Sequence, residues 1–120
     1  MSLLYTYEIT GMEPGKMHAL IHMDASHSVY KGHFPGFPVT PGVYQVRMIR
    51  EILEKELGKP LLLQNASQIK FIAVHEPASE PEINASISYS EAEGLFKVEA
   101  RLHRNEKTFL KLRGEFREQK

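Results

Sequence analysis

Side chains alternate in character from Lys16 to Asp24, with a period of two residues. Because successive side chains of a β-strand point to opposite faces, this period predicts a strand with one apolar face. The apolar face carries Met17, Ala19, Ile21 and Met23, and the other face carries His18, Leu20, His22 and Asp24. We therefore expect this strand to lie in a sheet that covers a core on one side.

A second pattern, with a period near 3.6 residues, predicts one helix from Pro41 to Leu57. Thr40 is placed to cap its first turn, and Pro41 suits the first helical position because no N–H donor is needed there. Gly58 and Pro60 indicate where the helix ends. The apolar stripe consists of Val46, Ile49, Leu53 and Leu57, widened by Met48 and Ile52, and the opposite side carries Arg47, Arg50, Glu51 and Glu54. We expect an amphipathic helix with one face on the core.

Further strand candidates follow the helix at residues 61–74, 82–89, 95–104 and 108–116. Turn residues separate these four candidates at 77–81, 91–94 and 104–107. Because no crossover helices lie between these strands, they favour an antiparallel sheet over a parallel one. We predict an α+β fold in which an antiparallel sheet curls over a single helix. Since the chain has 120 residues, we expect one domain spanning 1–120.

The composition narrows the class of protein. Lys plus Arg and Asp plus Glu each total 15, so no net charge attracts the chain to nucleic acid or to an anionic membrane. The chain has no cysteine, which excludes a disulfide framework, a thiol nucleophile and a thiolate metal site. No segment approaches the ~20 apolar residues of a membrane span, and residues 1–7 lack the features of a signal peptide. We expect a cytoplasmic protein with no membrane insertion and no nucleic-acid partner.

Candidate chemistry gathers in residues 32–43, a segment with three prolines and three glycines directly before the helix. Such a segment is stiff and holds its side chains in place. Because Pro41 has no N–H, the first free amides of the helix are those of Gly42 and Val43, at the positive end of the helix dipole. These amides suit the carbonyl oxygen of a thioester as it becomes an enolate. His33, upstream on the same loop, has the near-neutral pKa of a general base.

The run His33-Phe34-Pro35-Gly36, followed by Pro38, Pro41 and Gly42, resembles the motif of the 3-hydroxyacyl-acyl-carrier-protein dehydratases. The likeness extends more loosely over residues 15–116 and includes the segment 69–71. It implies the hot-dog fold, a long helix wrapped by an antiparallel sheet, usually paired into a dimer with active sites at the interface. It also implies the roles of the site residues: His33 as catalytic base, the Gly42 amide as the group that polarises the thioester, the Val39 carbonyl as the group that orients the imidazole, and Phe34 as a residue lining the site.

The chain departs from that family at Arg47, fourteen positions after the histidine, where the family has an acidic residue that handles the leaving hydroxyl. Arginine stays protonated at any working pH and cannot deliver a proton. Glu51 lies one helical turn further along, and we expect it to pair with Arg47, although it could reach the site itself. In that family the histidine of one subunit works with the acid of the other. A related subunit carrying the acid would therefore complete one site per heterodimer, with Arg47 lining the incomplete site.

We expect a hydro-lyase that dehydrates a 3-hydroxyacyl thioester, or hydrates its product, in fatty-acid or polyene-type biosynthesis. The substrate would be an acyl-carrier-protein or coenzyme A thioester, and the protein would be a homodimer or a heterodimer with a related hot-dog subunit. No cofactor is expected. Two alternatives remain: a non-catalytic or half-site subunit that pairs with an active dehydratase, and an acyl thioesterase in which Glu51 activates water.

The other polar residues give weaker signals. His18 and His22 share a strand face but stand about 13 Å apart, too far for one metal ion. We expect these two at the surface or an edge, His75 and His103 in solvent, and no metal site. The serines Ser26, Ser28 and Ser67 lack the glycine-flanked elbow of a hydrolase. Basic residues on the predicted strands could meet the phosphate arm of an acyl carrier, and these are Lys70, Lys97, Arg101 and Arg113.

Overall fold

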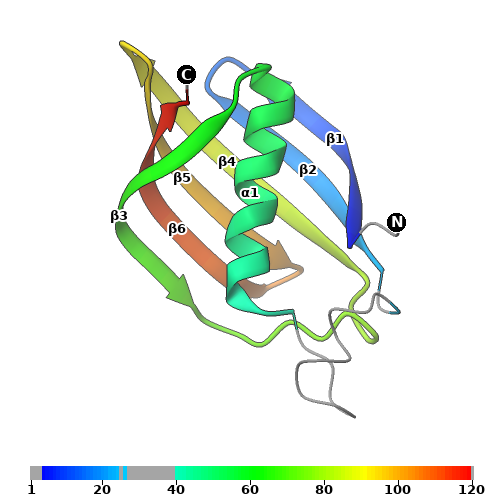
Figure 1. Cartoon of the computed structure of the whole chain (residues 1–120). Coiled ribbons are helices and arrows are strands. Elements are labelled where there is room, and N and C mark those ends of the chain that lie inside the picture. The colour runs from blue at the N-terminus through cyan, green and yellow to red at the C-terminus, as the bar shows by residue number, and fades with distance from the viewer. Residues whose placement is uncertain (1–3, 25, 27–39, 120) are drawn as a thin grey trace.

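The computed structural model describes residues 4–24, 26 and 40–119. Its elements are β1 (Tyr5–Glu13), β2 (Lys16–Met23), α1 (Gly42–Leu57), β3 (Leu61–Phe71), β4 (Glu82–Ala92), β5 (Leu95–Arg104) and β6 (Lys107–Glu118). The six strands form one sheet in the order β1-β2-β4-β5-β6-β3, and each neighbouring pair is antiparallel. The predicted α+β hot-dog arrangement, an antiparallel sheet wrapped around one helix, is confirmed (Figure 1).

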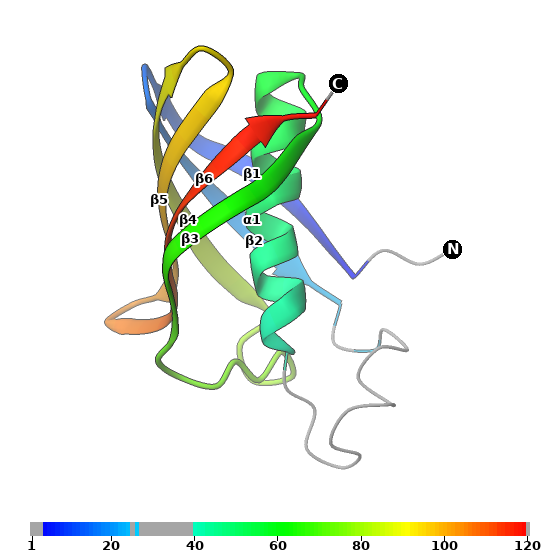
Figure 2. The ribbon, with the colours of Figure 1, turned by 60° about the vertical axis from the view of Figure 1, so that its left-hand side comes forward.

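The core lies between α1 and the concave face of the sheet (Figure 2). The predicted apolar face of β2 is fully buried there. On α1, Met48, Ile49, Ile52 and Leu53 are buried, whereas Val46 and Leu57 are only partly buried and pack at the margin of the core. The buried face is therefore rotated slightly from the predicted stripe. No helix among the described residues has both the length and the apolar run needed to cross a bilayer.

Strand β1 was not predicted, although its pattern is visible in the sequence. Tyr5, Tyr7 and Ile9 are partly buried and pack on the core, while the residues between them are exposed. This strand pairs with β2 along most of its length, with a bulge between Ile9 and Gly11. Two tyrosines at inward positions suit a strand at a sheet edge, because the ring packs inward and the hydroxyl reaches a polar partner.

The other strand predictions hold with shifted ends. Strand β5 spans the predicted residues, β4 and β6 are longer than predicted, and β3 ends at Phe71 rather than at residue 74. Gly58, with a φ of 68°, adopts the left-handed conformation that ends α1, as its sequence predicted.

The predicted start of α1 is wrong in one respect. The N-cap residue is Pro41, the helix begins at Gly42, and no side chain caps its first turn. Thr40 does not serve as the cap, because its hydroxyl bonds the imidazole of His75 instead, at 2.7 Å between Oγ1 and Nδ1. The first turn of α1 therefore lacks the side-chain acceptor that a threonine cap would have supplied.

Candidate active site

A groove of about 500 Å³ lies where the first turns of α1 face the edge strand β3. We call it the α1–β3 groove, and its lining residues are Gly42, Val43, Val46, Arg47, Arg50, Leu63, Ile69, Phe71 and Phe116. It brings together three residues predicted from the sequence: Gly42, Val43 and Arg47. Most of its lining is apolar, which suits an acyl chain more than a polar substrate.

Gly42 lies against the ring of Phe71. A Cβ atom added at this glycine would stand 2.5 Å from Phe71 Cζ, closer than any real Cβ contact. The ring itself remains 52% exposed, so the aromatic side chain lies on the groove without filling the core. A side chain at position 42 would therefore displace the exposed Phe71 ring from the start of the helix.

The first amides of α1 are placed for an outside acceptor. The Pro41 carbonyl accepts hydrogen bonds from the N–H groups of Tyr44 and Gln45. Within the described ranges, no acceptor contacts the N–H of Gly42 or Val43, and Val43 is 72% exposed. These donors carry the positive end of the helix dipole, so they suit an oxygen that gains negative charge.

Arg47 is held at the groove by an ion pair. Its Nε donates a 3.0 Å hydrogen bond to Glu51, which confirms the predicted pairing of these two residues. This hydrogen bond raises the pKa of Arg47 above its ordinary value, so the side chain stays cationic. The other carboxylate oxygen of Glu51 accepts a 2.6 Å hydrogen bond from the hydroxyl of Tyr5. Burial first, and then this bond, raises the pKa of Tyr5, so Tyr5 stays a neutral donor.

The consequence is that no described carboxylate lines the α1–β3 groove. Glu51 lies outside the lining, and both of its oxygens are occupied by Tyr5 and Arg47. The described lining of the groove therefore offers no carboxylic acid as a proton donor.

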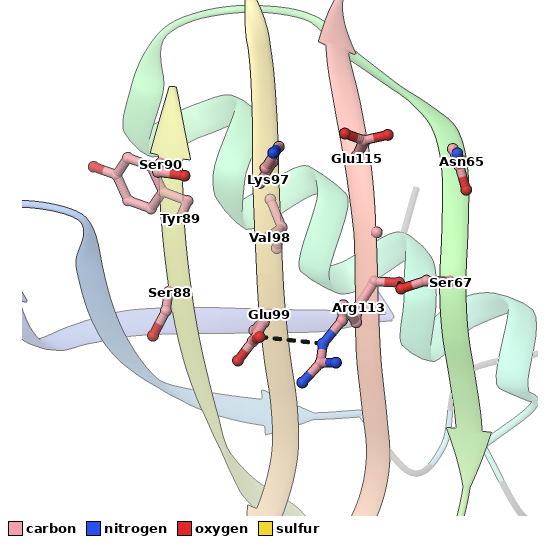
Figure 3. Close-up of a pocket in the computed structure, with 11 residues that line it drawn as sticks. Asn65, Ser67, Ser88, Tyr89, Ser90, Lys97, Val98, Glu99, Arg113 and Glu115 are labelled. Atoms are coloured by element: carbon pink, nitrogen blue, oxygen red, sulfur yellow. Dashed lines mark hydrogen bonds and ion pairs between the residues drawn. The ribbon is translucent and has the colours of Figure 1, made fainter. Parts of the chain in front are cut away.

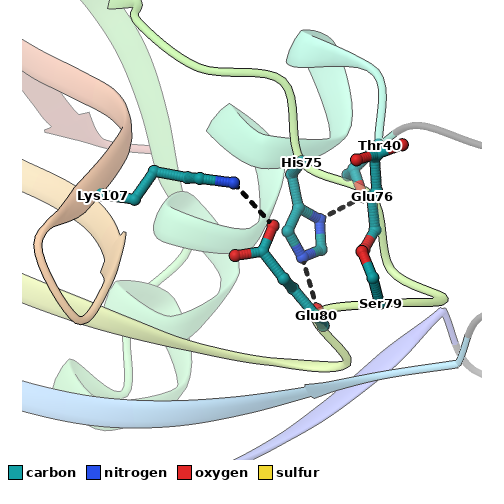
Figure 4. A network of polar contacts seen from close by, with 6 residues as sticks. All are labelled: Thr40, His75, Glu76, Ser79, Glu80 and Lys107. Carbon is teal, nitrogen blue, oxygen red and sulfur yellow. Dashed lines mark hydrogen bonds and ion pairs between the residues drawn. The ribbon is translucent and has the colours of Figure 1, made fainter.

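A buried hydrogen-bond network fixes Thr40, the residue before the N-cap Pro41 (Figure 4). The Thr40 hydroxyl lies 2.7 Å from His75 Nδ1, and His75 Nε2 lies 2.7 Å from the carbonyl oxygen of Glu80. The Thr40 N–H also donates to the His75 carbonyl, and Gln45 Nε2 donates to the Thr40 carbonyl. Thr40 is thus bonded through its side chain and both backbone groups. The network fixes the end of the predicted active-site loop relative to the segment between β3 and β4.

The prediction that His75 is solvated is wrong, because this residue is 0% exposed. A carbonyl oxygen only accepts, so Nε2 must carry the proton toward Glu80, and Nδ1 accepts from the Thr40 hydroxyl. The Glu80 carbonyl and the Thr40 hydroxyl therefore satisfy both nitrogens of a neutral imidazole. Burial is the main cause that lowers the pKa of His75 below its ordinary value, in agreement with that tautomer.

A pH-dependent loss of stability follows from this neutral histidine. The pKa is lower in the folded chain than in the unfolded one, so the unfolded chain binds the proton first as the pH falls. The contribution of neutral His75 to the free energy of unfolding is complete above the pKa of the unfolded chain, about 6.5. As the pH falls from there toward the lower pKa of the folded chain, this contribution is lost, by at most about 1.4 kcal/mol per pH unit. Urea unfolding between about pH 5.5 and 7.5 measures this slope.

The matched control is His75→Gln, whose amide has both N–H donors and an acceptor oxygen but does not titrate. We expect this variant to unfold with a shallower pH dependence than the unmodified chain. Equal slopes for the two chains would show that the proton is taken up by another group.

The remaining predicted site residues, His33, Phe34 and Val39, lie outside the described residues. Sequence reasoning did not single out Phe71 as a groove residue, although it noted the segment 69–71. It also missed Ile69 and Arg50 on the lining and the role of His75. For Ile69 and Phe71 a sequence signal was available. Ile69, Lys70 and Phe71 alternate on a strand, so Ile69 and Phe71 point to the same face.

Three further described histidines, His18, His22 and His103, lie on the outer face of the sheet. The Oγ atom of Ser86 stands 3.2 Å from His18 Nδ1 and 3.0 Å from His103 Nε2. His103 is thus partly buried rather than solvated, and burial is the main cause that lowers its pKa. His22 pairs with Glu82 at 3.0 Å. In the part of the chain that the structure describes, no cluster of three or more metal-ligating side chains occurs.

The fold and the groove define a protein of the hot-dog class. A sequence profile of the ApeI-like family, described as ApeI dehydratase, matches residues 10–110. The chain therefore belongs to the ApeI-like dehydratase family.

Solved structures share the fold at low sequence identity. A chain of the dehydratase heterocomplex ApeI:P from Xenorhabdus doucetiae superposes with a TM-score of 0.72 at 18% identity, covering 98% of this chain and 99% of that one. A conserved protein, PA5202, from Pseudomonas aeruginosa superposes with a TM-score of 0.67 at 13% identity, covering 94% of this chain and 88% of that one. An uncharacterized protein from Erwinia carotovora subsp. atroseptica superposes with a TM-score of 0.61 at 14% identity, covering 98% of this chain and 95% of that one. No curated protein matches the chain at a significant level.

Proposed function

We propose that this chain is the histidine-bearing subunit of a 3-hydroxyacyl thioester dehydratase, and that a second subunit supplies the acid. The observation that carries the proposal is the cationic Arg47 on a groove without a described carboxylate. Membership of a dehydratase family supports the reaction type. The active site is then complete only in a pair of subunits.

In this mechanism His33 removes the proton from the carbon next to the thioester carbonyl. The electron pair moves toward the carbonyl oxygen, and the amides of Gly42 and Val43 stabilise the negative charge there. The hydroxyl on the next carbon accepts a proton from the partner's acid and leaves as water, which forms the carbon–carbon double bond. The Val39 carbonyl orients the imidazole, and Phe34 lines the site. The reverse sequence hydrates an enoyl thioester.

The lining of the groove supports an acyl substrate. Val46, Leu63, Ile69, Phe71 and Phe116 supply apolar surface next to the helix-start amides. The volume of about 500 Å³ falls in the ordinary range for small-molecule sites. The substrate is a thioester of an acyl carrier protein or of coenzyme A, which fatty-acid or polyene-type synthesis would use.

The edge strand β3 supports pairing with another subunit. It is exposed at every position except Leu61 and Leu63, and its outer edge has no strand neighbour within the described part of the sheet. Large apolar side chains are exposed along it and just beyond it, and these are Leu62, Ile69, Phe71, Ile72 and Val74. An apolar, unpaired edge marks an interaction surface. A subunit docked there would close over the α1–β3 groove.

The nature of that subunit is open to two choices, a second copy or a related chain. We favour a related hot-dog chain that carries the acid, because two copies of this chain would bring two Arg47 side chains and no acid. The ApeI:P structure is described as a heterocomplex, which supports the same arrangement here.

A paired assay tests the reaction type. Loss of enoyl absorbance from a trans-2-enoyl thioester reports hydration, and release of free thiol reports hydrolysis. We expect hydration only when the acid-bearing subunit is present, and no thiol release. Thiol release by the purified chain would instead identify a thioesterase. Purification of the tagged chain from its native host supplies the partner for this assay.

A charge at the β3 edge should weaken subunit pairing. Ile72 is 49% exposed beside β3, and Met12 is 53% exposed on β1 at the opposite edge of the sheet. We expect Ile72→Glu to raise the dissociation constant of the dimer by about tenfold or more. Docking of the subunits would then bury a carboxylate that has no partner. Met12→Glu, a matched change at the other edge, should leave pairing unchanged. Sedimentation velocity measures both, and equal effects would exclude β3 as the interface.

The second candidate function is a non-catalytic subunit that stabilises an active partner. The ion pair of Arg47 with Glu51 favours it, because a positioned acid is the feature that this chain lacks. A dehydratase pair in which His33 can be replaced without loss of rate would support this alternative. The thioesterase alternative is less favoured, since both carboxylate oxygens of Glu51 are already occupied.

A further inference from the structure

Charged side chains form rows across the outer face of the sheet, the face opposite α1. The strand register defines three such rows on β4, β5, β6 and β3. The first is Ser90, Lys97, Glu115 and Asn65; the second is Ser88, Glu99, Arg113 and Gln68; the third is Ser86, Arg101, Lys111 and Lys70. Directly opposite residues on antiparallel strands are in contact distance, so each row acts as a unit.

In the first two rows, opposite charges face each other (Figure 3). Lys97 is opposite Glu115 in the first row. In the second row, Arg113 Nε lies 3.1 Å from a carboxylate oxygen of Glu99. The third row differs, because Arg101 is opposite Lys111, which is in turn opposite Lys70. We call these three residues the cation row.

No acidic side chain of the described residues forms an ion pair with the cation row. The remaining residues, 1–3, 25, 27–39 and 120, include no Asp or Glu. Like charges directly opposite each other destabilise a sheet. The row therefore lowers stability without a compensating contact in the chain, and an anion from outside would provide that contact.

A hollow of about 460 Å³ lies over this part of the sheet. Lys16, Arg101, Lys111 and Arg113 contribute cations to its lining, and Glu99, already paired with Arg113, is the one carboxylate among the described residues there. Further donors come from Ser86, Ser88 and Gln68 on the same lining. Cations beside hydroxyl and amide groups are the usual ligands of phosphate oxygens.

The lining favours a small anion over an acidic protein. Protein interfaces depend on apolar or aromatic anchors near their centre. None of the large exposed hydrophobic side chains of the described residues lines this hollow, and its two apolar residues, Ala100 and Leu112, are buried. The hollow therefore offers charge and hydrogen bonds without an anchor for a partner protein.

The geometry points to a binding site on the outer face, at the cation row, for a small molecule that carries a phosphate monoester or a diphosphate. Lys70, the third member of the cation row, is not on the lining of the hollow, where Arg101 and Lys111 lie with Lys16. At least two negative charges on the ligand are needed to offset the cations of Lys16, Arg101 and Lys111, which form no ion pair among the described residues. The site lies on the opposite face of the sheet from the α1–β3 groove, and it does not rest on the function proposed above.

Inorganic pyrophosphate is the probe for this site, titrated calorimetrically into the purified full-length chain at low ionic strength. We expect saturable binding by the unmodified chain, weakened by about fivefold in Lys111→Gln through loss of one exposed charge contact. Lys97→Gln removes the same charge from the first row, which the second row separates from the cation row, and should stay within about twofold of the unmodified chain. Orthophosphate should bind more weakly than pyrophosphate, and sulfate at matched ionic strength should not reproduce the pyrophosphate affinity.

Thermal unfolding supplies a second readout. Pyrophosphate should raise the melting temperature of the unmodified chain more than that of Lys111→Gln, while Lys111→Gln without ligand should melt higher because the repulsion is relieved. Absence of saturable pyrophosphate binding would overturn the proposal. Equal weakening by Lys111→Gln and Lys97→Gln would also overturn it, since the attraction would then be a general surface field. Binding of a hexaglutamate peptide that depends on Lys111, without pyrophosphate binding, would assign the surface to an acidic protein instead.

Discussion

Replacing Arg47 by glutamate should give this chain hydratase activity of its own. Residue 47 lines the α1–β3 groove. On the resemblance to the 3-hydroxyacyl-acyl-carrier-protein dehydratases it holds the position of the family's acid, so the variant is expected to supply a proton donor. A positioned acid contributes about 10²- to 10⁴-fold in rate, and we expect a gain of at least about 10²-fold over the unmodified homodimer. The readout is loss of enoyl absorbance from a trans-2-enoyl thioester.

The change is best made together with Glu51→Gln. Two carboxylates at positions 47 and 51, one helical turn apart, would repel each other. The amide oxygen of the introduced glutamine can still accept the hydrogen bond that Tyr5 now gives to Glu51. Glu51→Gln alone is the matched control and should remain inactive. If the double variant folds, dimerises and is still inactive, position 47 does not hold the acid in this protein.

Replacing His33 should abolish hydration in every active assembly of this chain. Loss of the general base lowers the rate by about 10²- to 10⁴-fold. The change is tested both in the natural complex and in the Arg47→Glu, Glu51→Gln background. His27→Ala removes another histidine, six positions before His33 in the sequence, and serves as the control with full activity. Retained activity in His33→Ala would remove this residue from the mechanism.

Local sequence signals predicted the elements that depend on neighbouring residues. The period of Lys16–Asp24 predicted the buried face of β2, and Gly58 predicted the end of α1 because a left-handed residue is needed there. The pairing of Arg47 with Glu51 followed from their spacing on one helix. In each case the interacting groups lie within a few residues of each other.

Contacts between distant segments could not be predicted in the same way. The Thr40 hydroxyl was assigned to the helix cap because its partner His75 lies 35 residues away. The approach of Phe71 to Gly42 depends on where β3 passes α1. The cation row depends on the register of three strands, whereas each of its residues read singly resembles an ordinary solvated side chain. The roles proposed for His33, Phe34 and Val39 remain predictions.

Complementation between two inactive chains tests the shared site most directly. The unmodified chain has His33 and lacks the acid, while a His33→Ala, Arg47→Glu, Glu51→Gln chain has the acid and lacks the base. Each should be inactive alone, and their co-expressed mixed dimer should hydrate an enoyl thioester through one rebuilt site. Full activity of the unmodified chain by itself, or a mixed dimer that stays inactive while the Arg47→Glu, Glu51→Gln chain is active, would contradict a site built from two subunits.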